Sequence, residues 1–306
     1  MRGMALGICA LVSLALQAPD SIHADQGVQG SSAAANQGIR WARSAVTPFK
    51  TVAMGTGGPS WRTVRYQPVT YGRGHATLPD FSEQQDVQTK KLRFFSFLLP
   101  LVDEENERLL DLRMRLSFIQ DHVRWHRDID QEDKAWLLEV VEEFRIPDVD
   151  IHSDEFWETA LRRVDAVPDH LVLAQAANES AWGTSRFARE GNNLFGQWCF
   201  RKGCGLVPLD RPAGATYEVA RFESVSHSIG SYMHNLNTGR TYRELREIRA
   251  AARQQGRQPD AVDMAGGLLS YSERGEDYIK ELRAMIRYNA VVIEEARTSL
   301  SHGASS

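Results

Sequence analysis

Hydrophobic residues recur at helical spacing through most of the chain after residue 85. Over residues 86–126 the pattern has a break at Pro100, which predicts either two packed helices or one bent helix. Further helical patterns cover residues 132–144, 153–164, 168–183, 224–235, 242–255 and 276–297. The chain is therefore expected to be mostly α-helical.

The helical period disappears between residues 197 and 222. Two short runs rich in β-branched and aromatic residues, 205–209 and 216–222, lie on either side of a turn signal at residues 211–214. This arrangement is typical of a β-hairpin. We therefore expect an α+β fold with a small β-hairpin lobe inserted among the helices.

The first 24 residues resemble a secretory signal peptide. A positive charge at Arg2 precedes an apolar run over residues 5–16, and Ala24 offers a cleavage site. The run is shorter than the ~18 residues of a membrane span, so we expect cleavage and export to the periplasm or cell envelope. A short buried helix is the alternative. Residues 25–83 are rich in Gly, Ser, Ala, Gln and Pro and are expected to form a flexible leader.

The rest of the chain is divided into expected domains, and the net charge narrows the class of partner. We expect a helical extension over residues 84–150, a main domain over 151–297 and a disordered tail over 298–306. The apolar segment 94–102 is interpreted as a core helix in preference to a membrane contact, because charges follow it closely. The formal net charge of −4, with mixed signs, argues against a nucleic-acid partner.

Two cysteines remain once Cys9 is removed with the signal peptide. In an exported protein Cys199 and Cys204 favour a small disulfide loop, whereas a zinc site would need further ligands close by. His227 and His234 share a predicted helix, but no third ligand follows at a suitable spacing, so packing is preferred to a metal role. We expect neither a metal nor a cofactor.

Glu179 is the candidate for chemistry. It lies near the end of a helix with a stripe of small apolar residues, Leu171, Ala174, Ala177 and Ala181. Burial beside Trp182 and the negative end of the helix should both raise the pKa of its carboxyl, as a general acid requires. A solvent-exposed glutamate is the alternative. The next loop, EGNNLFG, supplies asparagine amides of the kind that bind sugar hydroxyls.

These residues carry a resemblance to a known family. The stretches AQAANESAWGTSRFA and GNNLFGQW resemble the core of the glycoside hydrolase family 73 N-acetylglucosaminidases, which cleave peptidoglycan. The similarity extends to RVDAVPDHL, FESVSHSIGSYMHNL and YSERGEDYIKEL. Over most of residues 94–289 the chain also resembles the Bax-type envelope proteins that contain this domain.

The resemblance implies a lysozyme-like α+β fold and hydrolysis of the β-1,4 bond after N-acetylglucosamine in glycan strands. Glu179 matches the general acid of the family, and Tyr278 matches a second catalytic group. The residues expected to bind the glycan are Gln175, Trp182, Asn192, Asn193, Phe195, Trp198 and Tyr271.

A second carboxylate is harder to identify. Asp210 and Glu218 in the hairpin are the candidates, although for each taken singly a solvated hairpin charge is preferred to a catalytic role. A second acid about 5 to 5.5 Å from Glu179 would give retention, and one about 6.5 to 9.5 Å away would give inversion. Attack by the substrate's own acetamido group, with Tyr278 stabilising the positive ring, would need neither.

Two other functions remain open at this point. A lytic transglycosylase also uses a lone glutamate before serine, but here NNLFG replaces its usual glycine-leucine-methionine-glutamine turn. A glycan-binding protein without activity is the other alternative, and intact Glu179 and Tyr278 argue against it. The expected partner is peptidoglycan or a related N-acetylglucosamine glycan, and the oligomeric state is left open.

Overall fold

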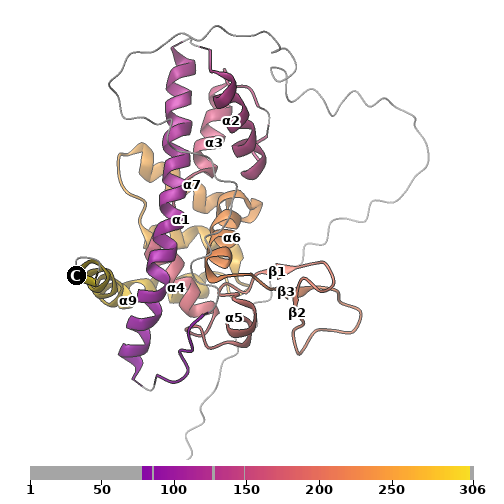
Figure 1. Ribbon diagram of the computed structural model, residues 1–306, viewed down its shortest axis with the longest axis vertical. Helices are drawn as coiled ribbons and strands as arrows, with labels where there is room; N and C mark the ends of the chain where they lie inside the picture. The colour runs from indigo at the N-terminus through magenta and orange to yellow at the C-terminus, as the bar shows by residue number, and fades with distance from the viewer. Residues whose placement is uncertain (1–77, 85, 126–127, 148, 304–306) are drawn as a thin grey trace, which may run out of the picture. The chain divides into compact units, whose positions relative to one another are not determined.

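The computed structural model describes residues 78–84, 86–125, 128–147 and 149–303. The expected signal peptide and residues 25–77 of the expected leader lie outside this part of the chain. The described chain forms two compact units, one from residues 108–165 and the other from residues 78–107 and 166–303. Helix α1 (Val87–Arg124) belongs to both, and it runs as one helix through Pro100 (Figure 1).

The unit of residues 108–165 is a small helical scaffold. Here the second half of α1 is joined by α2 (Gln131–Glu143) and α3 (Asp154–Arg163). Asp130 begins α2 as its N-cap, because its side chain accepts a hydrogen bond from the Asp133 amide at 2.8 Å. Buried Arg115 and Asp133 pair at 2.8 Å and link α1 to α2.

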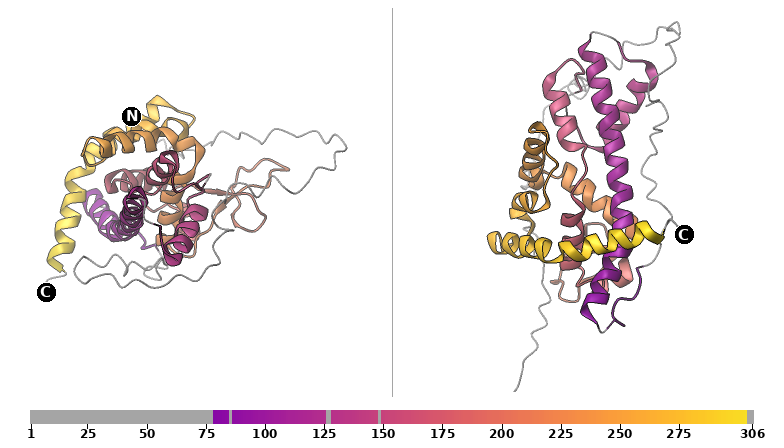
Figure 2. Two further views of the ribbon diagram at one scale, coloured as in Figure 1. Left: turned by 90° about the horizontal axis from the view of Figure 1, so that it is seen from above. Right: turned by 90° about the vertical axis from the view of Figure 1, so that its left-hand side faces the viewer.

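The other unit is built around α4 (Asp169–Glu179), whose residues from Leu171 to Ala177 are all buried. Helices α8 (Ala261–Ala265) and α9 (Glu276–Gly303) pack against it. Figure 2 shows α9 crossing the first half of α1, where Arg297 pairs with Asp103 at 3.1 Å. The remaining helices are α5 (Arg186–Gly191), α6 (Val225–Thr238), η3 (Arg240–Tyr242), α7 (Arg243–Gln254) and η4 (Gly266–Tyr271).

A small sheet lies between α5 and α6 in the chain. Its strands are β1 (Trp198–Cys199), β2 (Gly205–Leu206) and β3 (Glu218–Ala220), in the spatial order β1-β3-β2. Both pairings are antiparallel, with Trp198 opposite Val219 and Gly205 opposite Ala220. The prediction of a mostly helical α+β fold with a β-hairpin is confirmed. The strands are shorter than expected, and β1 adds a third strand.

Two expected disordered segments are partly structured. Leu78 and Phe81, at the end of the expected leader, are buried, and the Phe81 ring packs edge-on against Phe94 at 5.4 Å between ring centroids. Burial of this ring orders the segment because an aromatic side chain removes a large apolar area from water. At the other end α9 continues to Gly303, so residues 298–303 are helical.

The apolar segment 94–102 belongs to the core. Six of its side chains are buried: Phe94, Phe95, Leu98, Leu99, Leu101 and Val102. Among the helices of the described residues, none combines the length and apolar character needed to cross a bilayer. The core-helix interpretation of this segment therefore agrees with the structure.

Candidate functional site

Helix α4 ends at Glu179, earlier than the expected end at Gly183. The Ser180 hydroxyl donates to the Ala176 carbonyl at 2.6 Å and accepts from the Gly183 amide at 2.7 Å. Ala181, Trp182 and Gly183 then adopt positive φ angles of 51°, 60° and 76°. A right-handed helix cannot continue through left-handed residues, so Ala181 leaves the expected small-residue stripe and is exposed.

Glu179 is partly buried and hydrogen-bonded at one carboxylate oxygen. Its Oε1 accepts from the Tyr278 hydroxyl at 3.1 Å and from Asn178 Nδ2 at 3.2 Å. Burial raises the pKa of this carboxyl, the two hydrogen bonds lower it, and the nearby charge of Glu281 raises it, with a raised pKa as the net result. A raised pKa is the direction of change that a general acid needs.

Gln175 lies behind this pair, one α4 turn before Glu179, and its side chain is 0% exposed. Its Nε2 donates to the Tyr278 hydroxyl at 2.9 Å, and its Oε1 accepts from the hydroxyl of Tyr232 on α6. Gln175 was expected to contact the glycan, but its amide is occupied inside the protein. The sequence reasoning missed Tyr232, although this tyrosine lies in the stretch FESVSHSIGSYMHNL that carries part of the family resemblance.

Aromatic rings enclose this hydrogen-bonded group. Phe195 stacks on Tyr232 with centroids 3.9 Å apart, and Tyr271 stacks on Tyr278 at 5.5 Å. The Tyr271 hydroxyl donates to the Phe195 carbonyl at 3.0 Å. All four rings are buried. Phe195 and Tyr271, expected to bind the glycan, therefore form the packed support of Glu179.

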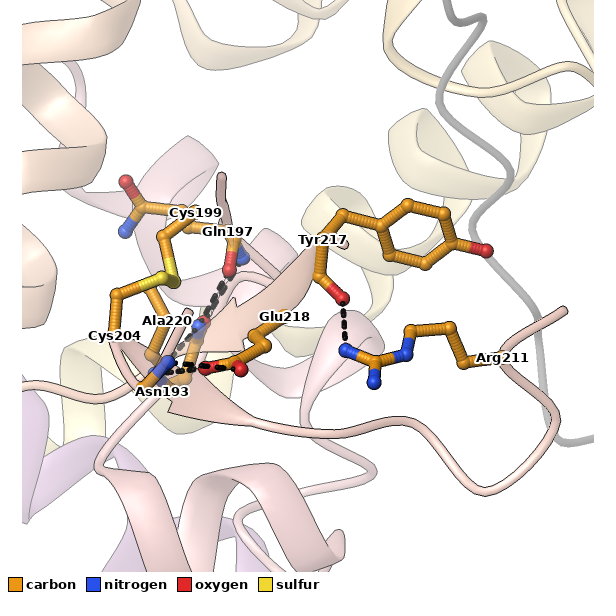
Figure 3. The surroundings of a disulfide bond; sticks show 10 residues. Asn193, Gln197, Cys199, Cys204, Arg211, Tyr217, Glu218 and Ala220 are labelled. Carbon is orange, nitrogen blue, oxygen red and sulfur yellow. Dashed lines mark hydrogen bonds between the residues drawn. A yellow bond between two sulfur atoms is a disulfide. The ribbon is translucent and has the colours of Figure 1, made fainter. Parts of the chain in front are cut away.

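The asparagine loop is used to fix backbone. Asn192 caps α5 with a left-handed φ of 52°, and its Nδ2 donates to the Phe222 carbonyl at 3.1 Å. Asn193 is buried, and its Nδ2 donates to the carbonyls of Gln197 at 2.9 Å and Ala220 at 2.8 Å. Both side chains thus attach the loop to the segment around β3, as Figure 3 shows for Asn193.

Glu218 stabilises the disulfide loop (Figure 3). Cys199 and Cys204 form a disulfide with their Cα atoms 6.2 Å apart. The two carboxylate oxygens of Glu218 accept from the amides of Gly203 at 3.0 Å and Gly205 at 2.8 Å, and these bonds lower the pKa of the carboxyl. The other acid proposed for the hairpin, Asp210, is exposed.

The two tryptophans near the site have different surroundings. Trp182 packs edge-on against Phe94 at 5.6 Å and Phe95 at 5.4 Å, so this part of the turn after α4 is attached to α1. Trp198 on β1 packs edge-on against Tyr217 at 4.8 Å. Both residues are half-buried, whereas the other aromatic residues expected to bind the glycan, Phe195 and Tyr271, are fully buried.

The histidines proposed as a weak metal alternative lie on α6, as predicted. His227 packs edge-on against Phe222 at 5.3 Å, and burial lowers the pKa of its imidazole. The sulfur atoms of Cys199 and Cys204 lie within 4.8 Å of a Glu218 carboxylate oxygen, but the sulfurs are bonded to each other. A disulfide has no thiolate to offer a metal ion.

Comparisons with known proteins agree with the sequence resemblance. A glucosaminidase family model, described as mannosyl-glycoprotein endo-beta-N-acetylglucosaminidase, matches residues 155–290. Protein bax from Escherichia coli strain K12 is 30% identical over 226 residues, which cover 73% of this chain and 79% of that protein. No solved structure matches. The region matched by the family model includes both Glu179 and Tyr278.

Proposed function

The chain belongs to the glucosaminidase family, and from this premise we propose that it is an endo-β-N-acetylglucosaminidase that hydrolyses peptidoglycan glycan strands. The bond cut is the β-1,4 bond after N-acetylglucosamine. The observation that carries this proposal is the Glu179 carboxyl, partly buried and hydrogen-bonded to Tyr278 at 3.1 Å within the matched region.

In this proposal Glu179 is the general acid. Its pKa is raised, which favours the protonated carboxyl, and this proton goes to the glycosidic oxygen as the bond breaks. Such proton transfer contributes a factor of about 10² to 10⁴ to the rate. Tyr278 orients the carboxyl through its hydroxyl.

The contacts favour a mechanism without a second protein carboxylate. Both oxygens of Glu218 already accept backbone hydrogen bonds, and Asp210 is exposed on the lobe. The substrate's 2-acetamido group then serves as the nucleophile, and water later opens the resulting ring intermediate. This route predicts a product that keeps the β configuration, which NMR of the first product formed would detect.

Product analysis tests the reaction class. Peptidoglycan digested in ¹⁸O-labelled water should give fragments with a reducing N-acetylglucosamine end that carries one labelled oxygen in the mass spectrum. A lytic transglycosylase would instead release 1,6-anhydro-muramoyl ends without the label, and finding these would overturn the assignment. A protein that only binds glycan would release no fragments.

Export to the periplasm or cell envelope is part of the proposal, because the substrate lies there. It is supported by the signal-like pattern of residues 1–24 and by the Cys199–Cys204 disulfide, since disulfides persist in oxidising compartments. Fractionation of cells that express the full chain tests it. The expected result is a processed protein in the envelope fraction, and an unprocessed protein in the cytosol would contradict it.

A further inference from the structure

Three hydrogen bonds connect α6, α4 and α9 in one direction. The Tyr232 hydroxyl donates to Gln175 Oε1, and Gln175 Nε2 donates to the Tyr278 hydroxyl at 2.9 Å. The Tyr278 hydroxyl then donates to Glu179 Oε1 at 3.1 Å. Gln175 and Tyr278 each accept one of these hydrogen bonds and donate the next, so the series of donors begins at Tyr232 and ends on the carboxylate.

We propose that Tyr232 is a positioning residue which, through Gln175, keeps the hydroxyl proton of Tyr278 directed at Glu179. The proposal rests on the proposed function, in which Glu179 is the general acid. Tyr232 itself has no part in bond breaking. Its contribution is to adjust the proton affinity of Glu179 through the two intervening residues, Gln175 and Tyr278.

The orientation of the Gln175 amide is the central point. A flipped amide would present Oε1 to Tyr278, and the Tyr278 proton would then have a second acceptor that competes with Glu179. The Tyr232 hydroxyl opposes this flip by donating to Oε1. Donation to Oε1 also polarises the amide, which strengthens the bonds further along the chain.

Tyr232 is well held for this task. Its ring is buried and stacks on Phe195 with an interplanar angle of 3°. Burial raises the pKa of its hydroxyl well above the ordinary value, so the hydroxyl remains a donor throughout the pH range in which Glu179 titrates.

Five other ionisable groups lie near Glu179. Its charge acts on four tyrosines, Tyr232, Tyr242, Tyr271 and Tyr278, on α6, η3, η4 and α9. Burial raises the pKa of each, that of Tyr242 to about 12. The fifth group is Glu281, whose exposed carboxylate pairs with Arg274 at 2.7 Å.

The test is a direct titration of Glu179 in the full chain without substrate. Protein labelled with ¹³C at its glutamate carboxyl groups is titrated by NMR, and the Glu179 signal is assigned from its absence in Glu179→Gln. In Tyr232→Phe the midpoint should rise by about 0.3 pH unit, the shift expected if polarisation adds roughly a fifth to a hydrogen bond to a charged group. The alkaline limb of the pH–kcat/KM profile should move in the same direction.

Tyr271→Phe is the matched control. It removes an equally buried hydroxyl from the same aromatic group, but that hydroxyl donates to the Phe195 carbonyl and lies outside the chain of donors. Its Glu179 midpoint should equal that of the parent, whatever its effect on the rate. An unchanged midpoint in Tyr232→Phe, or an equal shift in Tyr271→Phe, would overturn the proposal.

A second variant distinguishes the role of Gln175 from that of Tyr232 in this series of hydrogen bonds. Gln175→Met keeps the volume of the side chain but removes both of its hydrogen bonds, so it should shift the midpoint at least as far as Tyr232→Phe. A shift in Gln175→Met alone would overturn the role of Tyr232. Because the titration needs no turnover, it distinguishes these outcomes even if the chain cleaves no glycan, in which case only the proposed function fails.

Discussion

The hydroxyl of Tyr278 and the carboxylate of Glu179 lie 3.1 Å apart, although 99 residues separate them in the chain. The pair joins the end of α4 to the first turns of α9. Burial and this hydrogen bond act on Glu179 in opposite directions, because burial favours the neutral carboxyl and the hydrogen bond favours the ion. A change in either the burial of Glu179 or its hydrogen bond to Tyr278 should therefore change the pKa of this carboxyl.

Glu179→Gln should lower the rate of glycan cleavage by about 10²- to 10⁴-fold while glycan binding persists. The folded-state pKa of Glu179 is raised, so its contribution to stability is present at acid pH and lost as the pH rises through that pKa. The variant should therefore unfold at a higher temperature than the parent near neutrality and at the same temperature below the ordinary pKa of 4.5.

Zymograms and thermal unfolding at several pH values measure both effects. Glu281→Gln is the control, because it removes a nearby exposed acid without touching the reacting proton. This variant should remain active. The alkaline limb of its pH–kcat/KM profile should move to lower pH, because the charge of Glu281 raises the pKa of Glu179. Full clearing by Glu179→Gln would remove this residue from the mechanism.

Tyr278→Phe should shift the alkaline limb of the kcat/KM profile upward by about one pH unit. The variant loses a hydrogen bond to a charged group, and such bonds contribute about 1.5 to 3 kcal/mol, which corresponds to a pKa change of about one to two units. A lower rate with an unmoved limb would show that Tyr278 acts on the substrate and leaves the acid unaffected. The Tyr271→Phe profile provides the reference for a buried hydroxyl removed nearby.

Glu218→Gln should loosen the β-lobe without abolishing catalysis. The glutamine amide has one oxygen and one nitrogen, so it can replace only one of the two acceptors that Gly203 and Gly205 now use. The glycine amide that loses its acceptor should exchange faster with solvent, and KM should rise. The pKa of Glu218 is lowered, so in the parent this protection should be present above the ordinary value of 4.5 and lost as the pH falls through the folded pKa.

Asp210→Asn makes the same charge change at an exposed position of the lobe and should leave amide exchange unchanged. If Glu218→Gln abolished kcat while the lobe kept its protection, Glu218 would be the second catalytic acid, and the mechanism proposed above would have to be replaced.

Gly205→Ala should disrupt the pairing of β2 with β3. A Cβ atom at this position would lie 1.9 Å from the Val219 carbonyl oxygen, closer than any van der Waals contact permits. Gly203→Ala is the contrast, because a Cβ there meets open space and only the φ of 82° opposes it, at a cost of about 1 to 2 kcal/mol. The Arg221 amide donates to the Cys204 carbonyl at 3.2 Å beside this pairing. Its rapid exchange in Gly205→Ala alone is the expected result, and equal exchange in both variants would contradict it.

His170 should make stability depend on pH as the pH rises above the ordinary histidine pKa of 6.5. Its hydrogen bond to Asp169 at 2.8 Å, together with the charges of Asp169 and Glu294, raises its pKa against the effects of burial and Arg297. The stabilisation is fully present below the ordinary value of 6.5 and should be lost as the pH rises through the folded pKa.

Thermal unfolding of the parent and of His170→Gln across this range tests the effect. The difference between them should be largest at pH 6 or below, by about 2 to 4 °C for each kcal/mol lost, and should shrink as the pH rises. His152→Gln, at an exposed position, should follow the parent. A constant difference at every pH would mean that the charge of His170 has no role.

Element types were predictable because helical periodicity reflects burial on one face, and α1, α6 and α9 were found in this way. Their ends were less predictable. The end of α4 depends on hydrogen bonds of the Ser180 side chain, and the strand β1 has two residues, too few for any period. Phe81 orders the end of the expected leader through contacts with α1 that composition does not reveal.

Residues of the site were predictable where they belong to a local sequence motif. Glu179 follows from its helix and from the family pattern, but the contact of Gln175 with Tyr232 joins residues 57 positions apart on different helices. No spacing rule predicts such a pair. For the same reason Gln175, Phe195 and Tyr271 were expected to face the glycan, whereas the fold uses them to support the carboxyl.

The turn of Ala181, Trp182 and Gly183 has a consequence for engineering. Two of its three left-handed residues have side chains, and each such residue is strained by about 1 to 2 kcal/mol. Ala181 is exposed, so Ala181→Gly would relieve part of this strain without losing a packing contact. Trp182 has no equivalent exchange, because its ring holds the turn to α1. A thermostabilised variant of the chain can therefore be sought at Ala181, whereas the same strategy is closed at Trp182.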